Sequence, residues 1–312
     1  MTLSTKHLLG IETLSAEEIS SILDTAQSMK KEGAPPGKES SPLAGKTIIN
    51  LFYESSTRTR TSFELAGKRL GADVLNFDFS TSSMSKGETL KDTVINLQAM
   101  NPDILVIRHS APGAAAFVAE AVDASVINAG DGAHEHPTQA LLDLLTMREC
   151  RGSIQGLLVA ILGDIAHSRV ARSNIWGLTK LGATVRVAGP PTMIPPYIEN
   201  MGVEMFYSVE EAIADVDVIM CLRIQRERQQ KYLLPSLEEY AKFFGLNHER
   251  LAHAKKDVMI MHPGPINRGV EISSAVADGK NSFILEQVTN GVAVRMACFY
   301  LLAGGRQGHV AH

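Results

Sequence analysis

Residues 46–79 read KTIINLFYESSTRTRTSFELAGKRLGADVLNFDF, in which two short apolar runs flank a helical pattern. The runs KTIINLFY and ADVLNFDF have the near-continuous apolar character of strands that are buried on both faces of a parallel sheet. Between them, Phe63 and Leu70 lie on one face of a helix predicted over about Arg58–Leu70, and Gly71 suits its C-terminal cap. The stretch therefore predicts a strand, a helix that covers it and a second strand.

The same alternation continues along the chain, after an N-terminal helix announced by the capping box of Ser15 and Glu18. Further strands are predicted from the runs DILVIRH, SVINAG, GLLVAILGD, ATVRVAGP, VEMFYS, DVIMCLRI and DVMIMHPGP. Further helices are predicted at about 89–100, 113–121, 138–150, 169–181, 208–216 and 236–254. A final long helix, SFILEQVTNGVAVRMACFYLLAGG, is expected to be interrupted by an exposed Gly291. Two such series predict an α/β protein of two domains, each a mainly parallel sheet flanked by helices, with a cleft between them.

Composition limits the classes of function. The 312 residues are 45% hydrophobic and 21% charged, with a formal net charge of -4, so a general affinity for nucleic acid or an acidic membrane is not expected. Cys150, Cys221 and Cys298 are far apart and are expected to be reduced thiols. The N-terminus lacks the features of a signal peptide, and no apolar run approaches the roughly 20 residues of a membrane span, so the cytoplasm is the expected location.

Two arginines, Arg58 and Arg60, lie where the helix predicted at about Arg58–Leu70 begins, although acidic residues are preferred there because the helix dipole makes that end positive. Unpaired N–H groups at a helix start suit phosphate, and a guanidinium adds a matching fork of donors. In the alternative interpretation the arginines pair with Glu54 and Glu64, as Arg60 and Glu64 can at i,i+4 spacing. Hydroxyl donors are available from Ser56, Thr57 and Thr59.

Polar side chains recur after several other predicted strands. Open α/β sheets bind ligands beyond the carboxyl ends of their strands, and several anion-binding groups at successive ends predict a site for a small polyanion. The groups are Arg108, His109, His134, His136, Gln139, Asp164, Arg169, Arg223, Gln225 and the loop HPGPINRG at 262–269.

Competing motifs are weaker. LAGKT at 43–47 ends like a P-loop, but it leads into a strand and the earlier glycine is replaced by Ser40. The loop IAHSRVARS lacks the glycine spacing of a dinucleotide site, and no Gly-x-Ser-x-Gly elbow is present. HEH at 134–136 lacks a metal-binding partner at convincing spacing. Neither a metal nor another cofactor is therefore expected.

Eight segments, in order and over nearly the whole length, resemble the aspartate/ornithine carbamoyltransferase family, and within it the catalytic chains of the aspartate branch. They are SSTRTRTSFE, SMSKGETLKDT, IRHSAPGAA, HEHPTQALLDL, GDIAHSRVARSN, RIQRER, MHPGPINRGVEI and QVTNGVAVRMACFYLL. The resemblance implies two α/β domains, with the C-terminal helix returning to the first. It places a carbamoyl-phosphate-binding domain at 1–138 plus about 290–312, and an aspartate-binding domain at 139–289.

The resemblance also implies roles for the first half of the site. The phosphate is expected on Ser56, Thr57, Arg58 and Thr59, and the carbonyl oxygen on Arg108, His136 and the Thr59 hydroxyl. Gln139 and the backbone carbonyls near Gly264 and Pro265 are expected to accept from the carbamoyl amide. The residues expected to act in catalysis are Arg58, Thr59, Lys86, Arg108 and His136.

The second half is expected to bind L-aspartate. HPGP at 262–265 stands where the ornithine branch typically carries His-Cys-Leu-Pro, and two guanidinium groups suit a dicarboxylate but repel the ornithine side chain. The aspartate-binding residues are then Lys86, Arg169, Arg223 and Gln225. The implied reaction yields N-carbamoyl-L-aspartate and phosphate, an early step of pyrimidine (UMP) synthesis. A transcarbamoylase for another amine such as ornithine, or a catalytically silent homologue, remains an alternative.

The resemblance further implies a homotrimer with shared active sites. Ser82 and Lys86 lie on the polar loop STSSMSKGE, which in this family reaches into the active site of the adjacent chain. Without the family match, Lys86 reads as a solvated loop charge. The sequence leaves open whether trimers associate further, bind regulatory chains or join a dihydroorotase. No nucleic acid or membrane partner is expected.

Overall fold

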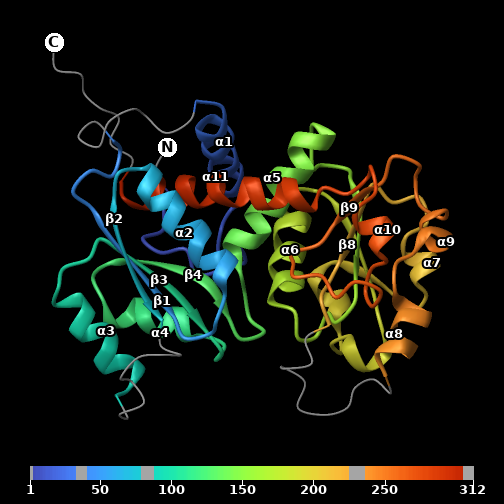
Figure 1. Cartoon of the computed structure of the whole chain (residues 1–312), viewed down its shortest axis with the longest axis horizontal. Coiled ribbons are helices and arrows are strands. Elements are labelled where there is room, and N and C mark those ends of the chain that lie inside the picture. Colours follow the sequence, from blue (N-terminus) through green and yellow to red (C-terminus); the bar gives the residue numbers. More distant parts are fainter. Residues whose placement is uncertain (1–2, 33–40, 79–87, 225–235, 305–312) are drawn as a thin grey trace. The chain divides into compact units, whose positions relative to one another are not determined.

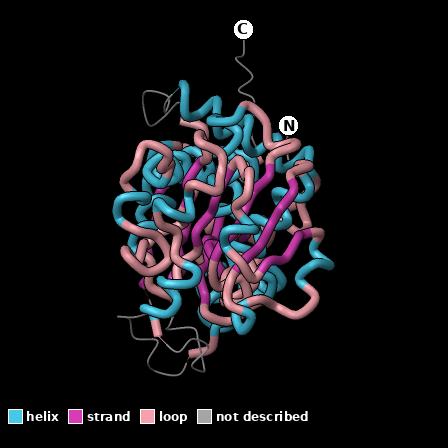
Figure 2. Tube along the Cα trace, turned by 90° about the vertical axis from the view of Figure 1, so that its right-hand side faces the viewer, coloured by secondary structure: helices cyan, strands magenta, loops and turns pink. Residues whose placement is uncertain are grey.

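The computed structural model describes residues 3–32, 41–78, 88–224 and 236–304. Figure 1 shows the whole chain, which divides into two compact units. Unit 1 comprises Met1–Leu141 and Asn290–His312, and unit 2 comprises Leu142–Thr289. Each is an α/β unit built on a parallel sheet, as predicted, and Figure 2 shows the strands enclosed between helices.

The described strands of unit 1 form a four-stranded parallel sheet in the order β2-β1-β3-β4. The strands are β1 Thr47–Phe52, β2 Asp73–Asp78, β3 Ile104–His109 and β4 Ser125–Asp131. The helices α2 Thr57–Arg69, α3 Leu90–Gln98 and α4 Ala114–Ala121 follow β1, β2 and β3 in the chain. After Thr47, every residue of β1 is buried, because both faces of the sheet are covered. Gly71 has the left-handed φ of 80° that the predicted helix cap requires.

The N-terminal segment adds to the open edge of this sheet. Leu8 donates to the Val126 carbonyl at 2.8 Å, and its own carbonyl accepts from the Asn128 N–H at 2.9 Å. Helix α1, Ala16–Glu32, follows with the predicted capping box. The Ser15 N–H lies 2.9 Å from Glu18 Oε2, and the Glu18 N–H lies 3.2 Å from the Ser15 hydroxyl.

The long C-terminal helix α11, Ile284–Leu302, packs on unit 1, which confirms that prediction. Phe299 lies 5.7 Å from Phe63 of α2 between ring centroids, and the Arg295 guanidinium lies 4.9 Å from the same Phe63 ring. Figure 1 shows α11 beside α2. The expected interruption at an exposed Gly291 is wrong, because the helix is continuous and Gly291 is buried.

Unit 2 contains a five-stranded parallel sheet in the order β7-β6-β5-β8-β9. The strands are β5 Leu158–Leu162, β6 Thr184–Ala188, β7 Val203–Phe206, β8 Val218–Cys221 and β9 Met259–Met261. The helices are α5 Pro137–Arg151, which begins in unit 1, then α6 Arg169–Lys180, α7 Val209–Ala212, α8 Leu237–Phe244, α9 His248–Leu251 and α10 Ser274–Ala277. Two 3₁₀ turns, η2 Pro191–Met193 and η3 Ile198–Met201, precede β7.

The helical stretch predicted at 236–254 is two helices, α8 and α9, separated at Gly245. A Cβ atom at Gly245 would lie 2.5 Å from the Val270 carbonyl oxygen and 2.7 Å from that of Ala241. The chain therefore turns here against a neighbouring backbone that only glycine can approach. Among the described residues, none of the helices has the length and apolar character needed to cross a membrane.

Candidate active site

The first turn of α2 has the features of an anion-binding helix start. Ser56 is the N-cap residue, yet its hydroxyl makes no capping hydrogen bond, and the turn contains no acidic residue. By contrast, the N-cap side chains of α3, α6 and α8 each accept from a backbone N–H of their own first turn. Thr57 and Arg58 are exposed, and Ser56 and Thr59 are half-buried. The N–H groups and hydroxyls of this turn are thus arranged to serve a bound anion.

Arg108 lies at the end of β3, beside this turn. The strand register pairs it with Phe52, and the Tyr53 N–H donates to the Arg108 carbonyl at 2.9 Å. Its side chain is 12% exposed; Nη2 donates to Glu54 Oε1 at 2.8 Å, and Nη1 donates to the Ala129 carbonyl at 3.1 Å. The sequence suggested Glu54 only as a partner of the arginines of α2, whereas the structure pairs it with Arg108.

The loop after β4 is organised by Asp131. Its buried carboxylate accepts from the Gly113 N–H at 2.7 Å, Asn128 Nδ2 at 2.7 Å and the Glu135 N–H at 3.1 Å, and His134 Nδ1 lies 3.1 Å away. Burial acts to raise the pKa of Asp131, but the hydrogen bonds, led by those from His134 and Asn128, outweigh burial and lower it. An ionised carboxylate therefore holds this loop in place.

His136 and Gln139 come next, at the start of α5. His136 precedes Pro137, the first helical residue, and its carbonyl accepts from the Gln139 N–H at 3.0 Å. Both side chains are buried. Because β1, β3 and β4 are parallel neighbours, their carboxyl ends lie along one edge of the sheet. This edge, the unit 1 edge, carries Ser56, Thr57, Arg58, Thr59, Arg108, His136 and Gln139.

Two other histidines of the predicted set have structural partners. His109 Nδ1 accepts from the Ala111 N–H at 2.9 Å, and its ring lies 5.1 Å from the Tyr53 ring. Burial lowers the pKa of His109, with a smaller opposing effect of nearby carboxylates. His134 pairs with Asp131. Both histidines therefore stabilise loops of the unit 1 edge.

In unit 2 the predicted residues follow the neighbouring strands β5, β8 and β9. Arg169 is the first residue of α6, and its side chain is buried. Ser168 caps this helix, and Asp164, after β5, lies 2.8 Å from His167 Nδ1. Arg223 follows β8 and is half-buried. Arg169, at the start of α6, and Arg223 thus follow two adjacent parallel strands, β5 and β8.

The segment after β9 is held by His262 and Glu271. His262 Nδ1 accepts from the Gly264 N–H at 2.8 Å, so the neutral ring carries its proton on Nε2 and donates it to Glu271 Oε1 at 3.0 Å. Glu271 also accepts from the Asn267 N–H at 2.6 Å. These bonds fix the backbone that presents the carbonyls of Gly264 and Pro265. Of the remaining predicted site residues, Ser82, Lys86 and Gln225 lie outside the described residues.

Two family models cover nearly the whole chain. The model described as "Aspartate/ornithine carbamoyltransferase, carbamoyl-P binding domain" matches residues 6–149, and the model described as "Aspartate/ornithine carbamoyltransferase, Asp/Orn binding domain" matches residues 155–302. The chain belongs to the aspartate/ornithine carbamoyltransferase family. The unit 1 edge falls in the first match, and Arg169, Arg223 and 262–265 fall in the second.

Relatives within this family are close in sequence. The chain is 61% identical over 307 residues to the aspartate carbamoyltransferase catalytic subunit of Syntrophotalea carbinolica, covering 98% of each chain. It is 62% identical over 299 residues to that of Syntrophus aciditrophicus, covering 96% of this chain and 97% of the relative.

Solved structures of both branches of the carbamoyltransferase family share the fold. The ornithine carbamoyltransferase of Pyrococcus furiosus has a TM-score of 0.86 at 32% identity, covering 98% of this chain and 100% of the other. The aspartate transcarbamoylase of Trypanosoma cruzi in complex with N-(phosphonacetyl)-L-aspartic acid has a TM-score of 0.85 at 31% identity, covering 96% of each chain. The fold alone therefore does not separate the two substrates.

The structure also shows supporting residues that sequence reasoning missed. Asp143 of α5 is buried and accepts from Asn174 Nδ2 and Gln287 Nε2, both at 2.8 Å. Gln287 in turn accepts from the His262 N–H at 3.0 Å. The signal in the sequence is a lone carboxylate within the apolar run ALLDLL, because a charge surrounded by leucines needs buried donors.

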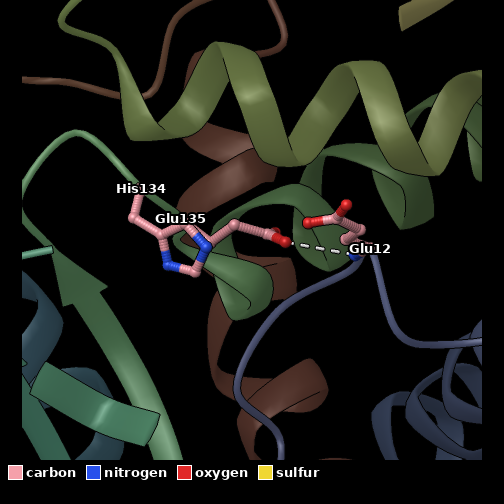
Figure 3. Close-up of side chains that lie close together, drawn as sticks. All are labelled: Glu12, His134 and Glu135. Carbon is pink, nitrogen blue, oxygen red and sulfur yellow. Dashed lines mark hydrogen bonds between the residues drawn. The ribbon is translucent and has the colours of Figure 1, made fainter. Parts of the chain in front are cut away.

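One cluster near the unit 1 edge has side chains of metal-binding type. Glu12, His134 and Glu135 place ligand atoms within 4.8 Å of one another, so the structure supplies a partner that spacing alone did not reveal (Figure 3). The two Glu135 carboxylate oxygens, however, accept from backbone: Oε2 from the Ile11 N–H at 2.8 Å and Oε1 from the Glu12 N–H at 3.1 Å. Glu135 is thus engaged as a hydrogen-bond acceptor.

Proposed function

We propose that the chain is the catalytic chain of an aspartate carbamoyltransferase, which converts carbamoyl phosphate and L-aspartate into N-carbamoyl-L-aspartate and phosphate. The observation that carries this proposal is the 61–62% identity, over nearly the full length of both chains, to relatives that bear this name. Two arginines, Arg169 and Arg223, follow adjacent parallel strands, and two guanidinium groups support a dicarboxylate as the second substrate.

Carbamoyl phosphate is assigned to the unit 1 edge. The first turn of α2 supplies N–H groups, hydroxyls and the exposed Arg58 to the phosphate, and its lack of an acidic residue favours an anion. Arg108, His136 and the Thr59 hydroxyl donate to the carbonyl oxygen. The carbamoyl amide donates to the Gln139 side chain and to the backbone carbonyls of Gly264 and Pro265.

In the proposed reaction the neutral α-amine of aspartate attacks the carbamoyl carbon and forms a C–N bond. Negative charge grows on the carbonyl oxygen, which Arg108 and His136 stabilise. The C–O bond to phosphate then breaks, its electron pair leaves with the phosphate, and the departing phosphate takes up the proton that the attacking nitrogen loses. Arg58 stabilises the departing oxygen. Each preplaced donor is worth about 10²–10³ in rate, and holding both substrates in attack geometry supplies another large contribution.

Lys86 and Gln225 complete the aspartate-binding set, and Ser82 and Lys86 act on the neighbouring chain of a homotrimer. The product feeds pyrimidine synthesis in the cytoplasm. The three cysteines form no disulfide, as is typical of proteins in that reducing compartment. A mass in solution of three 33.7 kDa chains, or a multiple, is expected. A monomer with full activity contradicts the shared site.

The discriminating assay supplies carbamoyl phosphate with either aspartate or ornithine and measures the carbamoylated amine. We expect aspartate to be the productive substrate. A faster reaction with ornithine overturns the assignment of Arg169 and Arg223, and no product with either amine supports a silent homologue.

A matched pair of variants tests the phosphate site. Arg58→Ala removes the donor to the leaving oxygen and is expected to lower kcat by about 10²–10³. Arg60→Ala removes the same charge from a nearby, half-buried position in the helix that is not one of the proposed phosphate contacts, and it is expected to retain kcat within about twofold. Equal activity of the two variants removes Arg58 from the mechanism.

A further inference from the structure

Glu135 is a buried carboxylate that precedes His136 in the chain. Its side chain is 1% exposed, and both of its oxygens accept from the backbone of the N-terminal segment, at Ile11 and Glu12. Figure 3 shows the Glu135 side chain extending away from His134 toward the backbone nitrogen of Glu12. Burial of a carboxylate is costly unless such donors satisfy it, so this contact is a specific one.

The N-terminal segment fits this carboxylate closely. A Cβ atom at Gly10 would lie 2.3 Å from Glu135 Oε1 and 2.8 Å from its carboxyl carbon, so only glycine leaves room for the contact. On the other side, Asn128 Nδ2 donates to the Leu9 carbonyl at 2.9 Å, and Leu8 is bonded along β4. The segment is therefore tied both to the sheet and to Glu135.

The backbone of Glu135 closes the turn that leads to His136. The Asp131 N–H donates to the Glu135 carbonyl at 3.2 Å, and the Glu135 N–H donates to Asp131 Oδ1 at 3.1 Å. His136 follows immediately, and its carbonyl accepts from the first turn of α5. A shift of Glu135 is thus passed directly to the backbone of His136.

We propose that Glu135 is a positioning residue: its carboxylate ties the N-terminal segment 10–12 to the turn 131–135 and so sets the position of His136. The inference rests on the role of His136 under the proposed function. A metal centre made of Glu12, His134 and Glu135 is the competing explanation. The metal centre is disfavoured because both Glu135 oxygens already accept from backbone N–H groups. In addition, Glu12 contacts Glu135 through its backbone N–H, and the exposed carboxylate of Glu12 takes no part in that contact.

Glu135→Gln tests the proposal with an isosteric side chain. Its amide can accept at one oxygen only, so one of the two backbone N–H groups is left facing a donor. We expect faster hydrogen exchange of the Ile11 and Glu12 amides. We also expect kcat to fall about tenfold, with KM for aspartate within about twofold, because His136 acts on the charge that develops in the transition state.

A double-mutant cycle separates positioning from a general structural role. In a His136→Ala background, Glu135→Gln should lower kcat by less than twofold, because the residue through which it acts is absent. Gly10→Ala, which displaces the carboxylate without changing it, should reproduce the kcat loss, and it serves as the perturbation should Glu135→Gln not fold. All variants are compared at a temperature well below their Tm.

Glu12→Gln is the matched control, since it keeps the backbone N–H and alters only the exposed carboxylate; unchanged kcat is expected. If Glu12→Gln and Glu135→Gln are equally impaired, and a chelator lowers the Tm of the wild type, the cluster is a metal centre and the proposal is overturned. Normal kcat in Glu135→Gln together with an impaired His136→Ala overturns the positioning role alone. A fully active His136→Ala overturns the proposed role of His136 and, with it, this inference.

Discussion

Arg108 Nη2 lies 2.8 Å from Glu54 Oε1, and this ion pair joins the end of β3 to the turn between β1 and α2. Arg108 also donates to the Ala129 carbonyl of β4, so one strand and one turn hold its guanidinium. The two side chains are 12% and 25% exposed, so the pair is partly shielded from water. Breaking it is therefore expected to cost more than breaking a fully exposed ion pair. Under the proposed function, this ion pair is expected to orient Arg108 toward the carbonyl oxygen of carbamoyl phosphate.

Glu54→Gln is expected to lower kcat/KM for carbamoyl phosphate about tenfold, equivalent to ~1.4 kcal/mol, because a neutral amide holds the guanidinium less firmly. Steady-state kinetics with varied carbamoyl phosphate measure this. Glu64→Gln is the control: it removes a carboxylate that lies 2.5 Å from Lys68 on the surface of α2 and should change kcat/KM by less than twofold. Equal kinetics for both variants contradict an aiming role of Glu54.

The sequence predicted well what local pattern determines. The strands β1 and β5 are continuous apolar runs, and the capping box of Ser15 and Glu18 and the left-handed Gly71 are formed by neighbouring residues. In each case the residues that cause the structure lie within a few positions of one another. For the same reason the start of α2, predicted at about Arg58, lies at Thr57, whereas the separate starts of α9 and α10 were not predicted.

The supporting contacts of the site could not be predicted in this way, because their partners are distant in the sequence. Glu54 is 54 residues from Arg108, and Glu135 is 124 residues from Ile11. The break between α8 and α9 likewise depends on the carbonyl of Val270, which approaches Gly245 only in the folded unit. Composition and spacing could propose the groups that face the substrates, but the groups that hold them emerge only from the fold.

Because α11 packs on unit 1, a substitution at Phe299 is expected to lower the stability of the protein strongly. Its ring is fully buried against Phe63, and Phe299→Ala is expected to lower the free energy of unfolding by about 3–5 kcal/mol, through lost burial and a residual cavity. Urea unfolding followed by circular dichroism measures the change. Leu285→Ala, on the same helix but 77% exposed in this chain, should shift the midpoint little. Similar midpoints for the two variants contradict the packing of α11 on unit 1.

The Asp131 carboxylate is expected to contribute to the free energy of unfolding in a way that depends on pH. Hydrogen bonds lower its pKa in the folded state below the ordinary value of 3.8, so the contribution is complete above that value and is lost as the pH falls through the folded pKa. Wild type is therefore expected to be more stable than Asp131→Asn at pH 6, with the difference shrinking as the pH falls below about 4. Urea unfolding at stepped pH measures the difference, and a constant difference contradicts the assignment.

Asp278, a surface carboxylate, is expected to differ from buried Asp131 in how salt changes its contribution to stability. The Asp278 carboxylate pairs with Arg268 at 2.7 Å on the surface, and that hydrogen bond lowers the pKa of Asp278. Any difference in unfolding midpoint between Asp278→Asn and wild type should vanish in about 1 M NaCl, where the Debye length is about 3 Å. The difference for buried Asp131 should largely persist, because salt does not reach it.

The three thiols are expected to differ sharply in reactivity. Cys150 is exposed, whereas Cys221 and Cys298 are buried, and burial raises the pKa of both, to about 12 for Cys298. At pH 8 a thiol of that pKa is ionised to only about 10⁻⁴, so a maleimide should modify Cys150 alone in the folded protein and all three thiols in urea. Peptide mass spectrometry locates the label, and Cys150→Ser should abolish the native reaction. Modification of Cys298 at the rate of Cys150 would show that α11 leaves unit 1 under native conditions.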